Sequence, residues 1–173
     1  MSDIRRPLRC GLIALALCAA SSAFAGIEVG GGVGGTVGGG TIDDHDSLIL
    51  DFEAGYRFDN NFALHAVYID EANEHDLCML ECSDLYHFQQ FYGVKGVAYM
   101  PLSHGFELLG GAGFGRSTSH NEHVDSPDLH DNEGLLSVGA QWRATQAFRV
   151  VLEYDYLTST SLQMMTARVH WEF

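Results

Sequence analysis

Apolar and polar side chains alternate without interruption through the last eight residues of the chain, 166–173. Successive strand side chains point to opposite faces of a sheet, so one face of this segment is apolar and the other is charged. The apolar face carries Ala167, Val169, Trp171 and Phe173, and the opposite face carries Arg168, His170 and Glu172. A strand of this kind that ends on an aromatic residue favours a membrane-spanning sheet closed on itself, because lipid tolerates no unpaired strand edge.

Seven earlier segments repeat this alternation: 26–36, 47–58, 62–69, 86–100, 106–116, 133–143 and 148–157. Their lengths are near the roughly 9–11 residues that a tilted membrane strand requires. The connections alternate in length, and all three even-numbered ones (59–61, 101–105 and 144–147) are short. In an up-and-down antiparallel barrel the even-numbered connections share one end, as the short periplasmic turns of outer-membrane barrels do. The sequence therefore predicts an all-β fold, an eight-stranded antiparallel up-and-down transmembrane β-barrel.

Residues 1–25 have the composition of a secretory signal peptide. Three arginines precede an apolar core at residues 10–20, and Ala23-Phe24-Ala25 supplies a small-x-small cleavage pattern. We expect cleavage after this pattern, which leaves residues 26–173 as one outer-membrane β-barrel domain, exported through the periplasm. Lipoprotein processing at Cys18 is the alternative, but bulky Leu17 stands where that signal has a small residue.

The overall charge narrows the choice of partner. The chain holds 9 Lys and Arg against 23 Asp and Glu, a net charge of −14, which argues against a nucleic acid partner. Removing residues 1–25 takes away three Arg and Asp3, so 6 basic and 22 acidic residues remain, for a net charge of −16. No later segment approaches the roughly 18 consecutive apolar residues of a membrane helix.

Charged residues of both signs gather on the glycine-rich polar face of the expected strands, and of the six remaining basic residues only Arg116 lies elsewhere. Since buried charges must be paired, this face is predicted to line a narrow lumen, while the apolar face meets lipid. The predicted ion-pair network comprises Glu53, Arg57, Lys95, Glu107, Arg143, Arg149, Glu153, Asp155, Arg168 and Glu172. His65, His87 and His170 are expected to be neutral members of the same network.

Two cysteines follow the expected cleavage point, Cys78 and Cys82. Export into an oxidising compartment predicts a disulfide between them that staples a local turn. Zinc binding by this pair with His75 or His87 is a weaker alternative, because no second cysteine pair accompanies them.

A further cluster of possible metal ligands lies between residues 117 and 132. His120, His123 and His130 stand among aspartates there and are weak candidates for a metal site. We favour a solvated acidic loop, because a flexible loop holds metal ligands poorly in place. No cofactor is predicted.

Several stretches resemble the small eight-stranded outer-membrane barrels of the OmpA/OmpX type. The resemblance lies in residues 93–102, 110–115, 152–156 and 169–173. It implies insertion by the barrel-assembly machinery, which would recognise the terminal Val169, Trp171 and Phe173. We also expect a monomer in the outer membrane of a Gram-negative-type cell, in contact with outer-membrane lipids and lipopolysaccharide.

The function that we predict is that of a structural or adhesive surface protein with acidic outer loops. A wide pore is not expected, because side chains fill the interior of an eight-stranded barrel. The alternatives are a small porin, a metal-binding loop and a lipid A-modifying enzyme that uses Ser117, Ser119 and His120 near a strand end. We favour a protein that is not an enzyme, because no His-x-Ser pair accompanies these residues.

Overall fold

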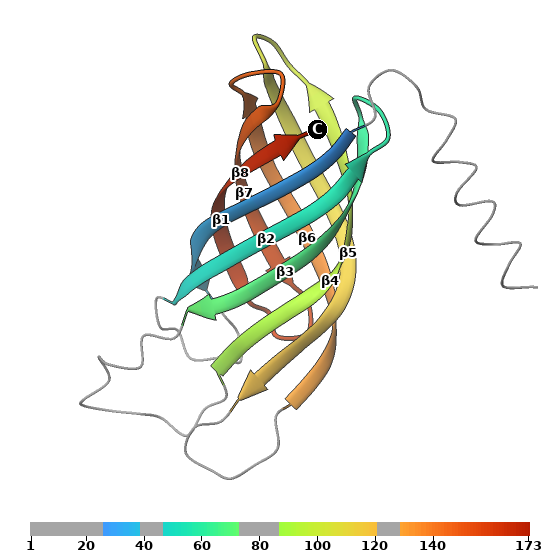
Figure 1. Ribbon diagram of the computed structural model, residues 1–173. Coiled ribbons are helices and arrows are strands. Elements are labelled where there is room, and N and C mark those ends of the chain that lie inside the picture. The colour runs from blue at the N-terminus through green and yellow to red at the C-terminus, as the bar shows by residue number, and fades with distance from the viewer. Residues whose placement is uncertain (1–25, 39–46, 73–86, 121–128) are drawn as a thin grey trace, which may run out of the picture.

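A computed structural model describes residues 26–38, 47–72, 87–120 and 129–173 (Figure 1). Its strands are β1 (Gly26–Gly38), β2 (Leu48–Arg57), β3 (Phe62–Ala72), β4 (His87–Pro101), β5 (Phe106–His120), β6 (Leu129–Arg143), β7 (Phe148–Leu157) and β8 (Gln163–Glu172). Each strand pairs antiparallel with its neighbours in the chain, and β8 returns to β1, so the sheet is a closed barrel. The predicted eight-stranded antiparallel fold is confirmed. Within the described residues, no helix has the length and apolar character to cross a membrane.

β5 and β6 are each four residues longer than the sequence predicts, whereas β4 has its predicted length. β4, β5 and β6 have 15 residues each, whereas the other five have 10 to 13. β5 continues to His120 and β6 begins at Leu129, so both enter the segment that the sequence assigned to a loop. Polar residues occupy both faces there, which removes the alternation that identifies a strand. These strands project beyond their neighbours at the end opposite the short turns (Figure 1).

The first and last strands close the barrel along a regular ladder. Val29 pairs with Trp171 and Gly32 pairs with Arg168. The ladder continues to the last residue, where the backbone N–H of Phe173 donates to the carbonyl of Ile27 at 2.9 Å. Closure of this seam pairs the backbone groups that would otherwise face lipid.

Inward-facing glycines allow β8 to lie close to β1. A Cβ atom on Gly30 would lie 2.2 Å from the His170 ring, and one on Gly32 would lie 2.3 Å from the carbonyl oxygen of Ala167. Real Cβ atoms do not approach other heavy atoms so closely. The side chains of β8 therefore occupy the part of the lumen that β1 leaves empty.

Many large apolar side chains of the strands point outward, but Phe88 departs from the parity that the sequence indicated. The sequence pattern placed Phe88 on the outer face, but its side chain is buried at 3% exposure. The β4–β5 register shifts between Phe88 and Gln90, and the extra residue reverses the alternation. Phe88 and Phe91 consequently both point into the barrel.

The lumen is divided along its length. Toward the end reached by the long strands it holds an apolar cluster of Ile49, Val67, Ile69, Phe88, Phe91, Leu135, Leu157, Leu162 and Met164. Charged side chains occupy the middle of the barrel and the end with the short turns. An apolar layer therefore covers the charged residues on one side.

Candidate functional site

The middle of the lumen is crossed by ion pairs between opposite walls. The ammonium group of Lys95 on β4 lies 2.5 Å from Glu53 Oε1 on β2 and 2.8 Å from Glu153 Oε1 on β7. All three side chains are at most 2% exposed. Because side chains from facing walls meet at the centre, they fill the cross-section of the barrel.

Arg168 on β8 makes the second set of contacts at this level. Its guanidinium pairs with Asp51 and Glu153, and its Nη1 lies 2.9 Å from Glu53 Oε1. Asp155 Oδ2 lies farther away, at 4.0 Å from Nη1. One guanidinium thus balances several carboxylates that water does not reach, as burial of charge requires.

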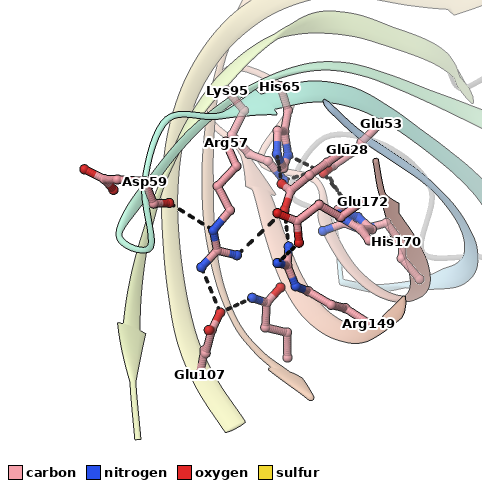
Figure 2. Close-up of polar contacts among 12 residues, drawn as sticks. Glu28, Glu53, Arg57, Asp59, His65, Lys95, Glu107, Arg149, His170 and Glu172 are labelled. Carbon is pink, nitrogen blue, oxygen red and sulfur yellow. Dashed lines mark hydrogen bonds and ion pairs between the residues drawn. The ribbon is translucent and has the colours of Figure 1, made fainter. Parts of the chain in front are cut away.

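His65 on β3 joins two neighbouring strands (Figure 2). Its Nδ1 lies 2.9 Å from Glu53 Oε2, and its Nε2 lies 3.0 Å from Glu28 Oε2. An ionised carboxylate only accepts hydrogen bonds, so two such contacts require a proton on each ring nitrogen. An imidazolium fits this geometry, not the neutral ring that the sequence suggested. His170 lies nearby, with its ring centroid 5.7 Å from that of His65.

Near the short turns, Arg57 connects the network to the backbone. Its Nη2 lies 3.1 Å from Glu107 Oε2 and donates to the carbonyl of Asn60 at 2.7 Å, and its Nε donates to the carbonyl of Asp59 at 3.1 Å. The guanidinium carbon lies 4.0 Å from the centroid of the Tyr99 ring, a cation–π contact. These contacts fix the end of β2 and its turn to the lumenal charges (Figure 2).

Arg149 and Arg143 complete the network at this end of the barrel. Arg149 on β7 pairs with Glu28 and Glu172, and thereby bridges the seam between β1 and β8. Arg143 lies at the rim with its side chain 35% exposed, and its Nη2 lies 3.1 Å from Glu107 Oε1. Gln141 also donates to Glu107.

The structure brings all ten residues of the predicted ion-pair network into ion pairs within the lumen or at its rim. It adds Glu28 and Asp51, which the predicted set left out although both have the inward parity of their strands. Parity identifies the face of a side chain but not its height in the barrel. Glu28 was therefore left out of the predicted network, although its carboxylate contacts Arg57, His65 and Arg149.

The other predicted sites are described only in part. Cys78, Cys82 and His123 lie outside the described residues, as does the side chain of His120. The exposed His130 has its Nδ1 3.1 Å from Thr118 Oγ1. Where side chains are described, no group of three or more His, Cys, Asp or Glu is arranged to hold a metal ion.

The serines considered for lipid chemistry are buried. Ser117 is 1% exposed, and its hydroxyl donates to Glu133 Oε1 at 3.4 Å. Ser119 is 7% exposed. Glu133 also accepts hydrogen bonds from the backbone N–H groups of Ser159 and Thr160, which places it as a support for the β7–β8 turn.

The residues predicted to form the assembly signal share the outer face of the last strand. Val169, Trp171 and Phe173 are 42%, 50% and 76% exposed. The Trp171 ring lies 6.2 Å from that of Phe148 and 6.4 Å from that of Phe173, measured between centroids. They form an apolar aromatic strip at the end of the barrel with the short turns.

Several solved structures have a fold similar to that of this barrel. The barrel is similar to the N-terminal β-barrel domain of Pseudomonas aeruginosa OprF, with 14% identity over 86% of this chain and 97% of that one and a TM-score of 0.61. Neisserial surface protein A (NspA) has 14% identity over 87% and 100% of the two chains and a TM-score of 0.58. Ail, the attachment invasion locus protein of Yersinia pestis, has 16% identity over 86% and 97% and a TM-score of 0.55.

These structural likenesses concern the fold alone, and no curated protein sequence matches the chain. The family assignment comes from the sequence itself. Residues 10–173 match the family described as "Outer membrane protein beta-barrel domain". The chain therefore belongs to the outer-membrane β-barrel protein family.

Proposed function

We propose that this protein is a non-enzymatic structural or adhesive component of the outer membrane, with a sealed lumen and an acidic surface outside the cell. Its outward apolar face suits lipid, and its closed sheet leaves no edge unpaired. The short turns would face the periplasm and the longer connections the exterior, as in other barrels of this kind.

The observation that carries the sealed lumen is the contact of Lys95 with Glu53 and Glu153 from opposing strands. The apolar cluster around Phe91 lies above it and would exclude water and ions from the outer end. A barrel filled in this way supports the outer membrane and presents a surface without conducting solutes.

Conductance in planar lipid bilayers tests this proposal. We expect the purified, folded protein to produce no large, stable channels, whereas a porin inserted under the same conditions provides the positive control. Large, stable channels from the wild-type protein would overturn the sealed-lumen function. Heat-modifiable gel mobility of the same sample verifies that the inserted protein is folded.

The acidic connections indicate which surface partners suit the protein. Segments 39–46, 73–86 and 121–128 contain ten Asp and Glu and no Lys or Arg. Ail, a structural neighbour, has been crystallised with the heparin analogue sucrose octasulfate. For this chain we propose a cationic partner instead, because ten carboxylates repel a sulfated polyanion. Retention on heparin at physiological salt would contradict this choice, and binding to a polycationic surface supports it.

A further inference from the structure

The outer face of β3 to β6 changes from apolar to polar along one line of the register. Tyr68, Tyr92, Arg116 and Asn132 are cross-strand neighbours on this line. The row beneath contains Val94 and Phe114, and Phe114 is 71% exposed. The row above contains Gln90, Thr118 and His130. By register these polar residues have the same outward parity as the apolar ones below them, although Thr118 is only 4% exposed.

The position of this line matches the outer boundary of a bilayer. At the opposite end of β5, Phe106 stacks on Trp142, with ring centroids 6.3 Å apart. The ten steps from Phe106 to Arg116 cover roughly 34 Å along the strand, or roughly 24–28 Å along the membrane normal at a tilt of 35–45°. The apolar band of such barrels is about 25 Å tall. If Phe106 lies at the inner interface, Arg116 lies at the level of the outer headgroups.

Arg116 differs in position from the other five Lys and Arg residues of segment 26–173. The other five, Arg57, Lys95, Arg143, Arg149 and Arg168, point into the lumen or lie at its rim and form ion pairs there. Arg116 is exposed on the outer face, and no carboxylate within the described part of the chain pairs with it. Asp70 on β3 shares this face but lies two strands away, and Asp131 immediately precedes Asn132 and so has the opposite parity.

We propose that Arg116, together with its neighbours Tyr92 and Asn132, binds a phosphate group of lipopolysaccharide in the outer leaflet. The inference rests on the proposed orientation, with the long strands outside. A guanidinium recognises phosphate through two parallel hydrogen bonds, and the flanking phenol and amide supply further donors. The long stem of the arginine lies against apolar surface while its charge reaches the headgroups. Residues 26–173 have a net charge of −16, and Arg116 is the one of their six Lys and Arg residues that lies on the outer face.

Binding of lipid A to the full-length barrel in phosphatidylcholine nanodiscs, measured by native mass spectrometry, tests the proposal. We expect wild-type protein to bind bis-phosphorylated lipid A. The affinity of Arg116→Gln should be lower by a factor of about ten or more, because the variant loses hydrogen bonds to a charged group. Arg116→Lys should keep part of the affinity, because it keeps the charge but loses the bidentate geometry. Dephosphorylated lipid A should bind the wild type no better than it binds Arg116→Gln.

Two controls make the result decisive. Arg143→Gln removes a partly exposed arginine at the other end of the barrel and should leave lipid A affinity unchanged. Heat-modifiable gel mobility verifies that each variant is folded. Equal binding by wild type and Arg116→Gln would overturn the proposal. Loss of all binding on addition of EDTA, with no effect of the substitution, would also overturn it and assign the contact to divalent cations on the acidic segments.

The orientation is tested separately. An epitope inserted between residues 39 and 46 should be reached by antibody on intact cells. Failure of the antibody to bind would contradict the proposed orientation, whereas a normal antibody signal with unchanged lipid A affinity would contradict the phosphate site alone. Conductance is independent of both measurements.

Discussion

At the scale of single residues, the lumen depends on Lys95, the one lysine of the chain. Its ammonium group lies between Glu53 and Glu153, and all three side chains are buried. A buried ion pair contributes little net stability compared with a well-packed apolar replacement, but removal of one partner leaves an uncompensated charge. Lys95 is consequently a position where a single change has a large effect.

Lys95→Met should destabilise the folded barrel by roughly 3–5 kcal/mol, the usual cost of breaking a buried pair from one side. Equilibrium unfolding in urea, with the protein in phosphatidylcholine vesicles, measures the change. Arg116→Gln in the same vesicles is the control, since its side chain is exposed and should alter stability by less than about 0.5 kcal/mol. A stability of Lys95→Met equal to that of the wild type would show that the lumenal carboxylates do not need the ammonium group.

The effect of adding a side chain at a glycine depends on whether the glycine faces the lumen or the outside of the barrel. Gly30→Ala places a Cβ atom 2.2 Å from the His170 ring, whereas Gly96→Ala on the outer face meets nothing closer than the Ala112 carbonyl oxygen at 3.8 Å. We expect the first substitution to prevent or strongly impair folding and the second to be tolerated. Heat-modifiable gel mobility after refolding into detergent compares them. Equal folding of the two variants would contradict the close approach of β8 to β1.

At the scale of elements, the seam between β1 and β8 decides whether the sheet closes. Deletion of Phe173 removes the backbone hydrogen bond to Ile27 and the aromatic contact with Trp171. We expect lower outer-membrane levels of this variant, detected by immunoblotting of membrane fractions. Replacement of residues 121–128 by a short Gly-Ser linker is the comparison and should have a smaller effect. Normal levels of the Phe173 deletion would refute the importance of this terminus.

Strand alternation predicted which residues face lipid because each strand of a membrane barrel separates two unlike environments. The pattern failed where this separation ends. The bulge between Phe88 and Gln90 reversed the parity of β4, and the polar ends of β5 and β6 resembled a loop, since polar residues occupy both faces there. The partners of Lys95 were not predictable, because alternation contains no information on which side chains meet across the lumen.

At the scale of the whole molecule, the charged network lies between barrel walls and beneath the apolar cluster that contains Phe91 and Leu157. Salt screens exposed charges but has little effect on buried pairs. We therefore expect the urea midpoint of unfolding to change little between about 0.1 M and 1 M NaCl, in contrast to the salt sensitivity typical of surface ion pairs. A marked fall of the midpoint with salt would indicate that solvent enters the lumen and would contradict the sealed barrel.

Because the strands differ in length, the two sides of the barrel are not equivalent within the plane of the membrane. At the end opposite the short turns, toward the bottom of Figure 1, β4, β5 and β6 extend farther than β7, β8, β1 and β2. Arg116 lies at the outer base of this extension. A glycolipid bound there would lie on the side of the long strands β4 to β6. A partner approaching from outside the cell would reach the barrel more easily on the opposite side, where the strands are shorter. Neighbouring proteins in a crowded bilayer would thus contact a different surface of the barrel depending on the side from which they approach.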